Sequence, residues 1–347
     1  MISLGFDARM IAHSGIGTYI REILKIVTSN PEFDLTLFGD LKLISDYYAQ
    51  KVLLDSPIYS LREQWTFPIL LNQHHVNFLH VPHYNIPLAY SGRLVVTVHD
   101  LIHLKYPTSK LAYFYARSLI HAACHKAQII IADSIHTQND LLEWVGVNPK
   151  KIKVVYPGLG NLFSDAPVRT KPNLESNVLL YVGNIRPTKN IPVLVNAFLK
   201  AEKKLKNIQL ILAGKNSMTE WTQQFANHPS IQFMGEVQLR VLKELYQKAR
   251  LFVFPSLYEG FGLPPLEAMS CGVPVLSSNA ASLPEVLGHA ALQFDPNNEN
   301  ELAEKICYLW ENAHEQESLI QKGYQNIQRF SWNETAQQVT KIYQSIA

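Results

Sequence analysis

The chain has 347 residues, about twice the length of an ordinary domain, so we expect two domains of comparable size. Hydrophobic residues make up 47% of the sequence, which supplies two cores without being the composition of an integral membrane protein. The formal net charge of +2 gives no reason to expect a nucleic acid as partner.

The start of the chain and its cysteines indicate a compartment. Residues 1–7 read as a strand with no basic segment before it, so we expect no signal peptide. Residues 64–92 contain no Asp, Glu, Lys or Arg, as a membrane-spanning helix would. The segment also contains three prolines and several polar side chains, which exclude such a helix. The cysteines (Cys124, Cys271 and Cys307) are too few and too scattered for a disulfide framework. These features predict free thiols in a reducing compartment and a cytoplasmic protein.

Short apolar, β-branched runs alternate with longer segments of helical period in the first half of the chain. The predicted strands are residues 2–6, 35–38, 78–81, 94–98, 129–132 and 153–155. The predicted helices include residues 17–28, 110–126 and 138–145. This alternation is typical of a parallel sheet with crossover helices.

The segment 157–177 interrupts this pattern, because it contains several glycines and prolines and shows no periodicity, so it is interpreted as a linker. The alternation then resumes, with strands predicted at 178–182, 209–213, 231–234, 251–255 and 274–277. Helices are predicted at 191–203, 238–249, 264–270, 299–310, 319–329 and 332–346. Asn190 is the expected N-cap of the first of these helices, and Gly272 the expected end of the third. The sequence therefore predicts two doubly wound α/β domains that face each other across a cleft.

Residues 256–267 form the most informative segment. An apolar strand runs through Gly260 and Gly262 into a helix, with Glu259 in the loop and Glu267 one turn into the helix. Free backbone N–H groups at such a helix start bind phosphate or sugar oxygens, and carboxylates accept hydrogen bonds from sugar hydroxyls. The alternative is structural: Glu267 stabilises the helix start and the two glycines only make the turn.

A second loop carries two cations. Arg186 and Lys189 follow the strand at 178–182 and precede a helix, an arrangement that suits a diphosphate. The alternative is a pair of solvated surface charges.

Two further motifs follow strands of the first half. Gly15 and Gly17 form a Gly-x-Gly loop that departs from the dinucleotide fingerprint, because Ile20 stands in place of the third glycine. His99 and Asp100 end the strand at 94–98, where polar side chains face the ligand in this architecture, although a core histidine is the alternative. The other histidines lack metal-ligand spacing, so we expect no metal site.

Together these segments resemble family 4 of the retaining nucleotide-sugar glycosyltransferases, which have the GT-B fold. The resemblance spans nearly the whole chain. Its most specific part is the E-x7-E motif from Glu259 to Glu267, accompanied by 183–190, 282–286 and 330–332 in the second half. His99-Asp100 and the run 132–137 match the family pattern in the first half.

The resemblance implies roles for particular residues. Arg186 and Lys189 would hold the donor diphosphate, and Glu267 would bind the ribose. Glu259, with the backbone of Gly260 and its neighbours, would hold the donor sugar and its phosphate. The backbone N–H groups of Phe261, Gly262 and Leu263 would also contact the donor phosphate and sugar. Glu236 and Val237 would contact the base, and His99 would contact the transferred sugar. Gly15 and Gly17 would approach the donor phosphates and the acceptor.

The resemblance also implies an overall organisation. It predicts two Rossmann-like domains at residues 1–165 and 166–331, with the final helix, about 332–347, packed back on the first. Members retain anomeric configuration and need no metal or other cofactor, because the cationic loop neutralises the departing diphosphate. Catalysis then rests on positioning and electrostatic stabilisation.

Donor and acceptor are less specified. The similarity is greatest to bacterial mannosyltransferases of polysaccharide and lipopolysaccharide assembly, so we favour GDP-mannose, with UDP-glucose and related donors left open. We expect a glycan or a lipid-linked acceptor. Residues 93–126 contain five Lys/Arg, one acid and several aromatic residues, either a surface for anionic membrane lipid or an ordinary solvated helix face. The alternatives to transfer are a GT-B sugar-nucleotide epimerase and a catalytically silent nucleotide-sugar-binding subunit.

Overall fold

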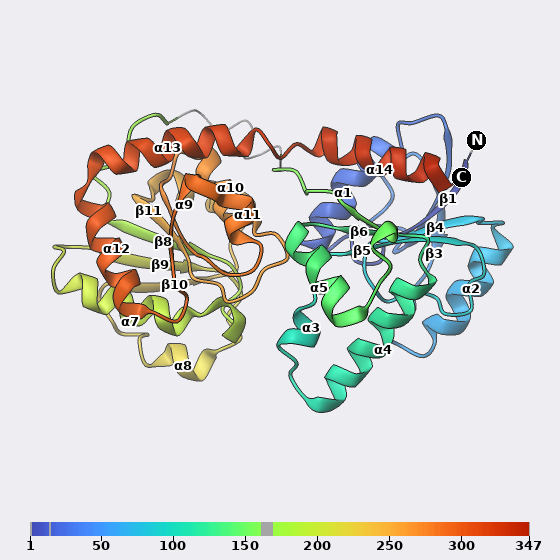
Figure 1. Cartoon of the computed structure of the whole chain (residues 1–347), viewed down its shortest axis with the longest axis horizontal. Coiled ribbons are helices and arrows are strands. Elements are labelled where there is room, and N and C mark those ends of the chain that lie inside the picture. Colours follow the sequence, from blue (N-terminus) through green and yellow to red (C-terminus); the bar gives the residue numbers. More distant parts are fainter. Residues whose placement is uncertain (1, 14, 161–168, 347) are drawn as a thin grey trace. The chain divides into compact units, whose positions relative to one another are not determined.

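The computed structural model describes residues 2–13, 15–160 and 169–346. The chain divides into two compact units, of which unit 1 comprises residues 1–158 and 330–347 and unit 2 comprises residues 159–329 (Figure 1). The domain boundary expected between residues 165 and 166 lies outside the described residues.

Unit 1 is built on a parallel sheet whose described strands have the order β3-β2-β1-β4-β5-β6-β7. Neighbouring strands all pair in parallel. The strands are β1 (Ile2–Asp7), β2 (Phe33–Gly39), β3 (Gln50–Leu53), β4 (Phe78–Val81), β5 (Arg93–Val98), β6 (Ile129–Ala132) and β7 (Ile152–Val154). The chain order reverses between β1 and β4, so their carboxyl ends mark the topological switch point, where ligands of such sheets bind.

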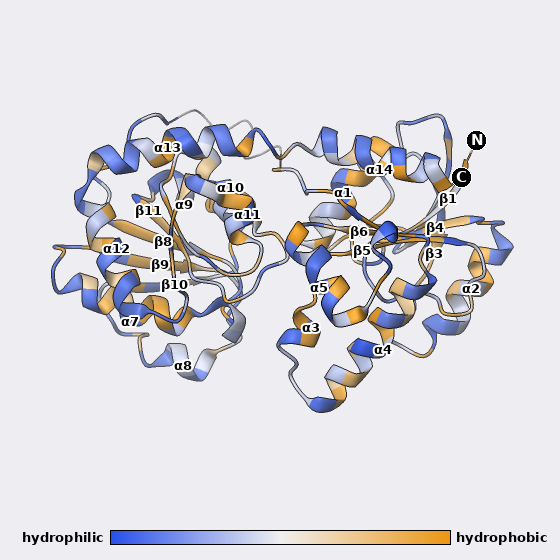
Figure 2. Ribbon diagram, in the orientation of Figure 1, coloured by the Kyte–Doolittle hydropathy of each residue, from blue (hydrophilic) through white to orange (hydrophobic). Residues whose placement is uncertain are grey.

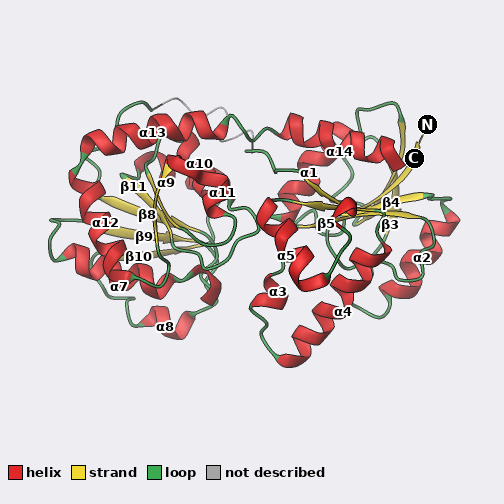
Figure 3. Cartoon of the chain, in the orientation of Figure 1, coloured by secondary structure: helices red, strands yellow, loops and turns green. Residues whose placement is uncertain are grey.

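Helices connect these strands (Figure 3). They are α1 (Ile16–Val27), α2 (Glu63–Gln73), α3 (Ile102–Lys105), α4 (Lys110–Lys126), α5 (Ile135–Val145) and the 3-10 turn η1 (Pro149–Lys151), with α14 (Trp332–Ile346) added from the end of the chain. Serine side chains begin two of them: Ser109 accepts from the N–H of Ala112 at the start of α4, and Ser134 accepts from the N–H of Thr137 at the start of α5.

Unit 2 repeats this plan with a parallel sheet whose described strands have the order β10-β9-β8-β11-β12-β13. The strands are β8 (Val178–Val182), β9 (Gln209–Ala213), β10 (Ile231–Gly235), β11 (Leu251–Phe254), β12 (Val275–Ser278) and β13 (Ala291–Phe294). The helices are α7 (Ile191–Glu202), α8 (Thr219–Gln223), α9 (Leu239–Lys248), α10 (Leu263–Ser270), α11 (Leu283–Leu287), α12 (Glu299–Glu311) and α13 (Ala313–Ile327), with 3-10 turns η2 (Pro187–Lys189) and η3 (Gly288–Ala290). The switch point of this sheet lies between β8 and β11.

The strand sequences explain why the sheets are interior. β6 reads Ile-Ile-Ile-Ala and is buried along its whole length, as expected for a parallel strand covered on both faces. Figure 2 shows the strands largely in the hydrophobic colour, whereas the helices alternate between hydrophilic and hydrophobic turns. Each unit is therefore a Rossmann-like domain, with helices that cover both faces of one parallel sheet, as the sequence predicts.

Helix α14 is held in unit 1 by an apolar stripe and a buried polar chain. Trp332, Ala336, Val339 and Tyr343 are buried at helical spacing in the core that also contains α1. The hydroxyl of Tyr343 lies 2.5 Å from Nδ1 of His80, whose Nε2 lies 2.9 Å from the hydroxyl of Thr97. Burial lowers the pKa of His80 to about 3, so this histidine is neutral in the folded protein.

One capping expectation is confirmed in position but not in its hydrogen bond. Asn190 occupies the N-cap position of α7, but its side chain makes no capping bond. Its backbone is left-handed with φ of 56°, and its amide donates instead to the carbonyl of Pro296 at 2.7 Å. Gly272, in contrast, has φ of 67° just after α10 and ends that helix as expected.

None of the helices in the described part of the chain is both long and apolar enough to cross a membrane. The cysteines are free, with Cys124 and Cys271 buried and Cys307 partly exposed.

Candidate functional site

Two loops leave the switch point of unit 2. The loop after β8 covers residues 183–190, and the loop after β11 covers residues 255–262. The N–H of Leu257 donates to the carbonyl of Thr188 at 2.9 Å, so the two loops are joined directly. The carboxyl ends of adjacent strands thus bring the two motifs identified in the sequence side by side.

Lys189 and Glu259 are in direct contact at this point. The ammonium of Lys189 donates to Oε1 of Glu259, and only 11% and 13% of the two side chains are exposed. The ammonium also lies 5.5 Å from the ring centroid of Phe254, the last residue of β11. Both charges are therefore fixed in place before any ligand arrives.

Arg186 precedes the 3-10 turn η2 that carries Lys189. The side chain is partly buried, and its Nε is buried with no hydrogen-bond partner among the described residues. A buried guanidinium N–H without a partner carries a desolvation cost that an oxygen ligand would remove. Arg186 and Lys189 thus bring two cationic side chains together on one loop at this switch point.

The loop after β11 has a fixed shape up to the start of α10. The hydroxyl of Ser282 donates to the carbonyls of Glu259 and Phe261, each at 3.0 Å. Gly262 has φ of 97°, and a Cβ added there would lie 2.7 Å from the side chain of Leu283. Leu263 then begins α10 with no side-chain cap, and Gly260 and Phe261 are buried beside it. This helix start presents backbone rather than side-chain donors, as anion sites do.

Glu267 lies in the second turn of α10. Its Oε2 accepts a hydrogen bond from the hydroxyl of Tyr246 at 2.9 Å. Burial raises the pKa of Glu267 to about 7, and the bond from Tyr246 offsets only part of this effect. Its charge, and hence its strength as an acceptor for hydroxyl groups, changes around neutral pH.

Glu236 and Val237 follow β10, the edge strand of the same sheet. Glu236 is exposed and Val237 is partly buried. They lie at the same carboxyl edge as Lys189, with β9 between β10 and β8. The structure thus places them at the rim of the candidate site and not in its centre.

In unit 1, Gly15 is the N-cap residue of α1 and Gly17 lies in the first turn of that helix, while Ser14 lies outside the described residues. Gly15 is exposed with φ of 74°, a conformation that favours glycine. Gly17 is buried, and a Cβ there would lie 2.4 Å from the carbonyl oxygen of Ile11. Gly17 is therefore required by close backbone packing, and Gly15 is the residue of the pair that faces solvent.

His99 follows β5 and is bound through both ring nitrogens. Nδ1 lies 2.6 Å from Oδ2 of Asp133, which follows β6, and Nε2 lies 3.1 Å from the carbonyl oxygen of Pro82. Burial alone would lower the pKa of His99, but Asp133, Asp100 and the carbonyl of Pro82 together outweigh it and raise that pKa above its ordinary value. Asp133 lies within the motif 132–137, but no local sequence pattern pairs it with His99.

A buried charge cluster at the switch point of unit 1 was not predicted. Arg9 binds Asp7 through Nη2 at 2.7 Å and through Nε at 3.0 Å, and it binds Glu63 through Nη1 at 2.5 Å. Nε2 of His83 lies 3.2 Å from Oδ2 of Asp7, and the amide of Asn85 donates to Glu63. The only signal in the sequence was an acid at the end of the first strand. This cluster shapes the carboxyl edge of the unit 1 sheet.

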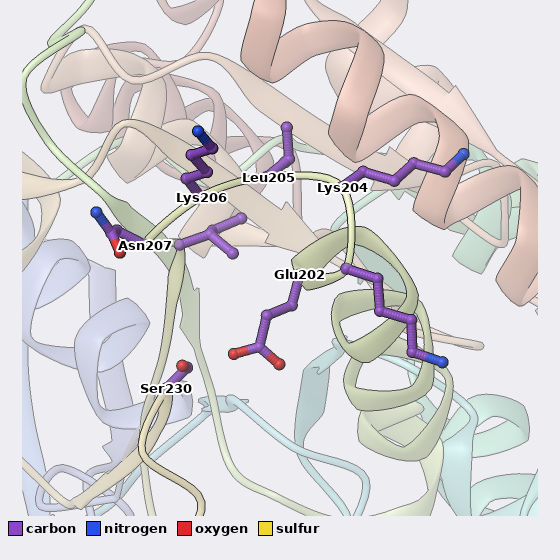
Figure 4. A pocket seen from close by; sticks show the side chains of 8 residues that line it. Glu202, Lys204, Leu205, Lys206, Asn207 and Ser230 are labelled. Carbon is purple, nitrogen blue, oxygen red and sulfur yellow. The ribbon is translucent and has the colours of Figure 1, made fainter.

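Among the described residues, neither the metal-ligating side chains nor the hollow of Figure 4 adds a second candidate site. Within the described ranges, no group of three or more His, Cys, Asp and Glu side chains is placed to hold a metal ion. The hollow in Figure 4 is lined by residues 202–208 and Ser230. These residues precede β9 and β10, so the hollow lies at the amino ends of those strands, at the edge opposite Lys189 and Glu259.

Family comparisons cover both halves of the chain. Residues 28–159 match the model described as Glycosyltransferase Family 4, and residues 164–326 match the model described as Glycosyl transferases group 1. The O-antigen chain mannosyltransferase B of Escherichia coli is 29% identical over 320 residues, which cover 87% of this chain and 82% of that protein. The O-antigen chain mannosyltransferase RfbU of Salmonella typhimurium is 31% identical over 223 residues, 62% of this chain and 60% of that protein.

Solved structures show the same fold over the full length. Sucrose-phosphate synthase from Thermosynechococcus elongatus superposes with a TM-score of 0.81 at 20% identity, covering 99% of both chains. Anabaena Alr3699/HepE, solved in complex with UDP and glucose, superposes with a TM-score of 0.79 at 19% identity, covering 99% of this chain and 100% of that one. With the family matches in both halves, the chain therefore belongs to the family 4 glycosyltransferases of GT-B fold.

Proposed function

We propose that the protein is a retaining, metal-independent hexosyltransferase that moves mannose from GDP-mannose to a glycan or lipid-linked acceptor. The observation that carries this proposal is the convergence of Arg186, Lys189 and Glu259 at the switch point of unit 2, with Glu267 on the adjoining helix. The similarity to O-antigen mannosyltransferases supports mannose as the sugar. GDP follows from that choice of donor, and UDP-sugars are its competitors in the test.

The proposed reaction assigns each bond to a group. The bond between the sugar C1 and the diphosphate oxygen breaks, and its electron pair leaves with the nucleoside diphosphate. Arg186 and Lys189 neutralise the charge that develops there, so the positive charge that a metal ion could supply comes from the protein. The acceptor oxygen bonds to C1 on the same face, and its proton passes to the leaving diphosphate. No protein carboxylate acts as a nucleophile.

A donor panel tests this proposal. GDP-, UDP-, ADP- and dTDP-sugars are compared for protection against thermal unfolding and for release of the nucleoside diphosphate, with and without EDTA. We expect GDP-mannose to give both signals, undiminished by EDTA. Protection without release by any donor would favour a silent binding subunit. Conversion of a donor to its stereoisomer would favour an epimerase.

Glu259→Ala should lower kcat far more than it weakens nucleotide binding. Glu259 contacts Lys189 and is proposed to hold the sugar, so its loss removes an interaction that matters in the transition state. We expect kcat to fall on the order of 10²-fold, the cost of one preorganised electrostatic contact. The Kd for GDP, measured by calorimetry, should change by less than about threefold. An equal loss in kcat and in GDP affinity would contradict this role.

Membrane contact is proposed through the first turns of α2 and α4, since exposed apolar side chains gather there. Leu61 and Trp65 are 86% and 76% exposed, and Leu111 and Phe114 are 83% and 60% exposed. The segment that leads into α2 is linked to α4, because the hydroxyl of Tyr115 donates to the carbonyl of Tyr59 at 3.3 Å. Residues 101–132 contain no Asp or Glu, so the basic residues of α4 favour an anionic lipid surface.

Vesicle flotation measures this contact. At low salt we expect the protein to float with vesicles that contain phosphatidylglycerol and to remain behind with vesicles of phosphatidylcholine alone. The double variant Trp65→Ser/Phe114→Ser should lose at least about tenfold in partitioning, because two large apolar side chains no longer insert. Leu239→Ser is the matched control, since Leu239 is an exposed apolar residue of unit 2. Equal flotation of wild type and double variant would end this hypothesis.

A further inference from the structure

We infer that Asp133 and the carbonyl of Pro82 hold His99 as an imidazolium, and that Asp133 is the positioning residue of this arrangement. The inference about protonation stands on unit 1 alone. The part that this cation plays in transfer rests on the proposed function.

The geometry of the two ring nitrogens requires two protons. Nδ1 faces a carboxylate oxygen of Asp133 at 2.6 Å, and Nε2 faces the carbonyl oxygen of Pro82 at 3.1 Å. A carboxylate and a carbonyl oxygen can only accept hydrogen bonds. A neutral imidazole has one N–H, so it would set a nitrogen lone pair against one of these oxygens. An imidazolium donates to both.

The proton between Nδ1 and Oδ2 belongs to the ring. Imidazole is more basic than an aspartate carboxylate by about 2.6 pH units in model compounds. The ring nitrogen is therefore the donor of this bond, and the carboxylate oxygen is the acceptor. Asp133 and His99 form an ion pair in which 7% of the Asp133 side chain and 17% of the His99 side chain are exposed.

The groups around His99 favour its positive charge. Asp100, the next residue in the chain, adds a second negative charge. The ring of Tyr19 on α1 lies edge-on at 5.1 Å between centroids, and the hydroxyl of Thr137 on α5 donates to the carbonyl of His99. His80 on β4 is neutral, as its lowered pKa indicates. On α5, Asp140 pairs with His136 of the same helix and with Lys105 of α3.

A protonated His99 has a defined chemical character. Neither nitrogen has a lone pair, so the ring cannot accept a proton from an acceptor hydroxyl. Because both N–H groups are already bonded to Asp133 and Pro82, the ring acts on a ligand through its positive charge. This result is consistent with a reaction in which the leaving diphosphate, and not a protein base, receives the acceptor proton.

The protonation state is measured directly by NMR of 15N-histidine-labelled protein, with His99→Gln to assign the signal. We expect the titration midpoint of His99 to lie above the ordinary 6.5 in the wild type. Asp133→Asn should lower that midpoint by about one pH unit or more, because a neighbouring opposite charge shifts a pKa by one to three units. Asp133→Glu should restore part of the shift. Asp140→Asn removes another buried carboxylate of unit 1 and should leave the midpoint unchanged.

The same variants are compared for nucleoside diphosphate release against pH. We expect the alkaline decline of kcat to move to lower pH in Asp133→Asn, with the KM for the donor changed less than about threefold. A wild-type midpoint below 6.5, or an unchanged midpoint in Asp133→Asn, would overturn the inference. Absence of release with every donor would contradict the proposed function, while the NMR titration would still decide the protonation of His99.

Discussion

Lys189→Ala is expected to lower kcat/KM for nucleoside diphosphate release by about 10²–10³-fold. The ammonium is held by Glu259 and lies over the ring of Phe254, so it is in position before the donor binds. A preorganised charge does not have to reorient as the leaving group forms, which is why its loss costs this much. The measurement is steady-state kinetics with saturating acceptor, or donor hydrolysis where no acceptor has been found.

The controls separate charge from folding. Lys200 and Glu299 form a second Lys–Glu pair in unit 2, but their side chains are 40% and 36% exposed and lie away from the switch point. Lys200→Ala should keep wild-type kinetics, because exposed pairs contribute little. Lys189→Arg should retain more activity than Lys189→Ala, since it keeps the charge. A Lys189→Ala protein that unfolds at the wild-type temperature and turns over normally would remove Lys189 from the site.

Arg9→Met should destabilise unit 1 by about 3–5 kcal/mol, the cost of breaking a buried ion pair by removing one partner. Asp7 is fully buried and Glu63 is 2% exposed, so both carboxylates would lose their cation in the interior. Burial would raise the pKa of Asp7, but Arg9 and His83 together outweigh it and hold that pKa well below its usual range. The free energy of unfolding is measured by urea titration with hydrogen exchange of the amides of β1 and β4, because two units need not unfold together.

The destabilisation of Arg9→Met should depend on pH. The lowered pKa of Asp7 contributes stability above its ordinary value of 3.8, and this stability is lost as the pH falls through the folded-state value. The variant lacks this contribution, so its difference from the wild type should shrink below about pH 4. Arg62→Met is the matched control, because Arg62 pairs with Asp55 at the surface, and we expect a change within about 0.5 kcal/mol. A loss below 1 kcal/mol in Arg9→Met at pH 7 would contradict the assigned network.

The central strands of both sheets were predicted from the sequence, whereas some of the peripheral elements were missed. β5 and β6 are apolar, β-branched and buried on both faces, so their composition alone identifies them. β3 (Gln50–Leu53) lies at an edge of the unit 1 sheet, and β13 (Ala291–Phe294) lies at an edge of the unit 2 sheet. Both strands have mixed composition and were not predicted. α2 was also missed, because Pro68 lies inside it and it has little amphipathic pattern. Such elements depend on tertiary pairing more than on local preference.

The candidate site was predicted to the extent that its residues stand within one motif. Glu259, Gly262 and Glu267 are close in sequence, so spacing located them on one loop and helix. Pairs from distant segments were not accessible, because nothing local joins Asp133 to His99 or Arg9 to Glu63. Those contacts arise where carboxyl ends of parallel strands meet, and they require the strand order.

Release of GDP from GDP-mannose in EDTA, with wild type and Lys189→Ala measured side by side, tests the central claim most directly. We expect release by the wild type, no gain on adding Mg²⁺, and at least about a hundredfold less release by Lys189→Ala at equal folding. Wild-type release that requires a divalent cation, or release that is unaffected by Lys189→Ala, would contradict it.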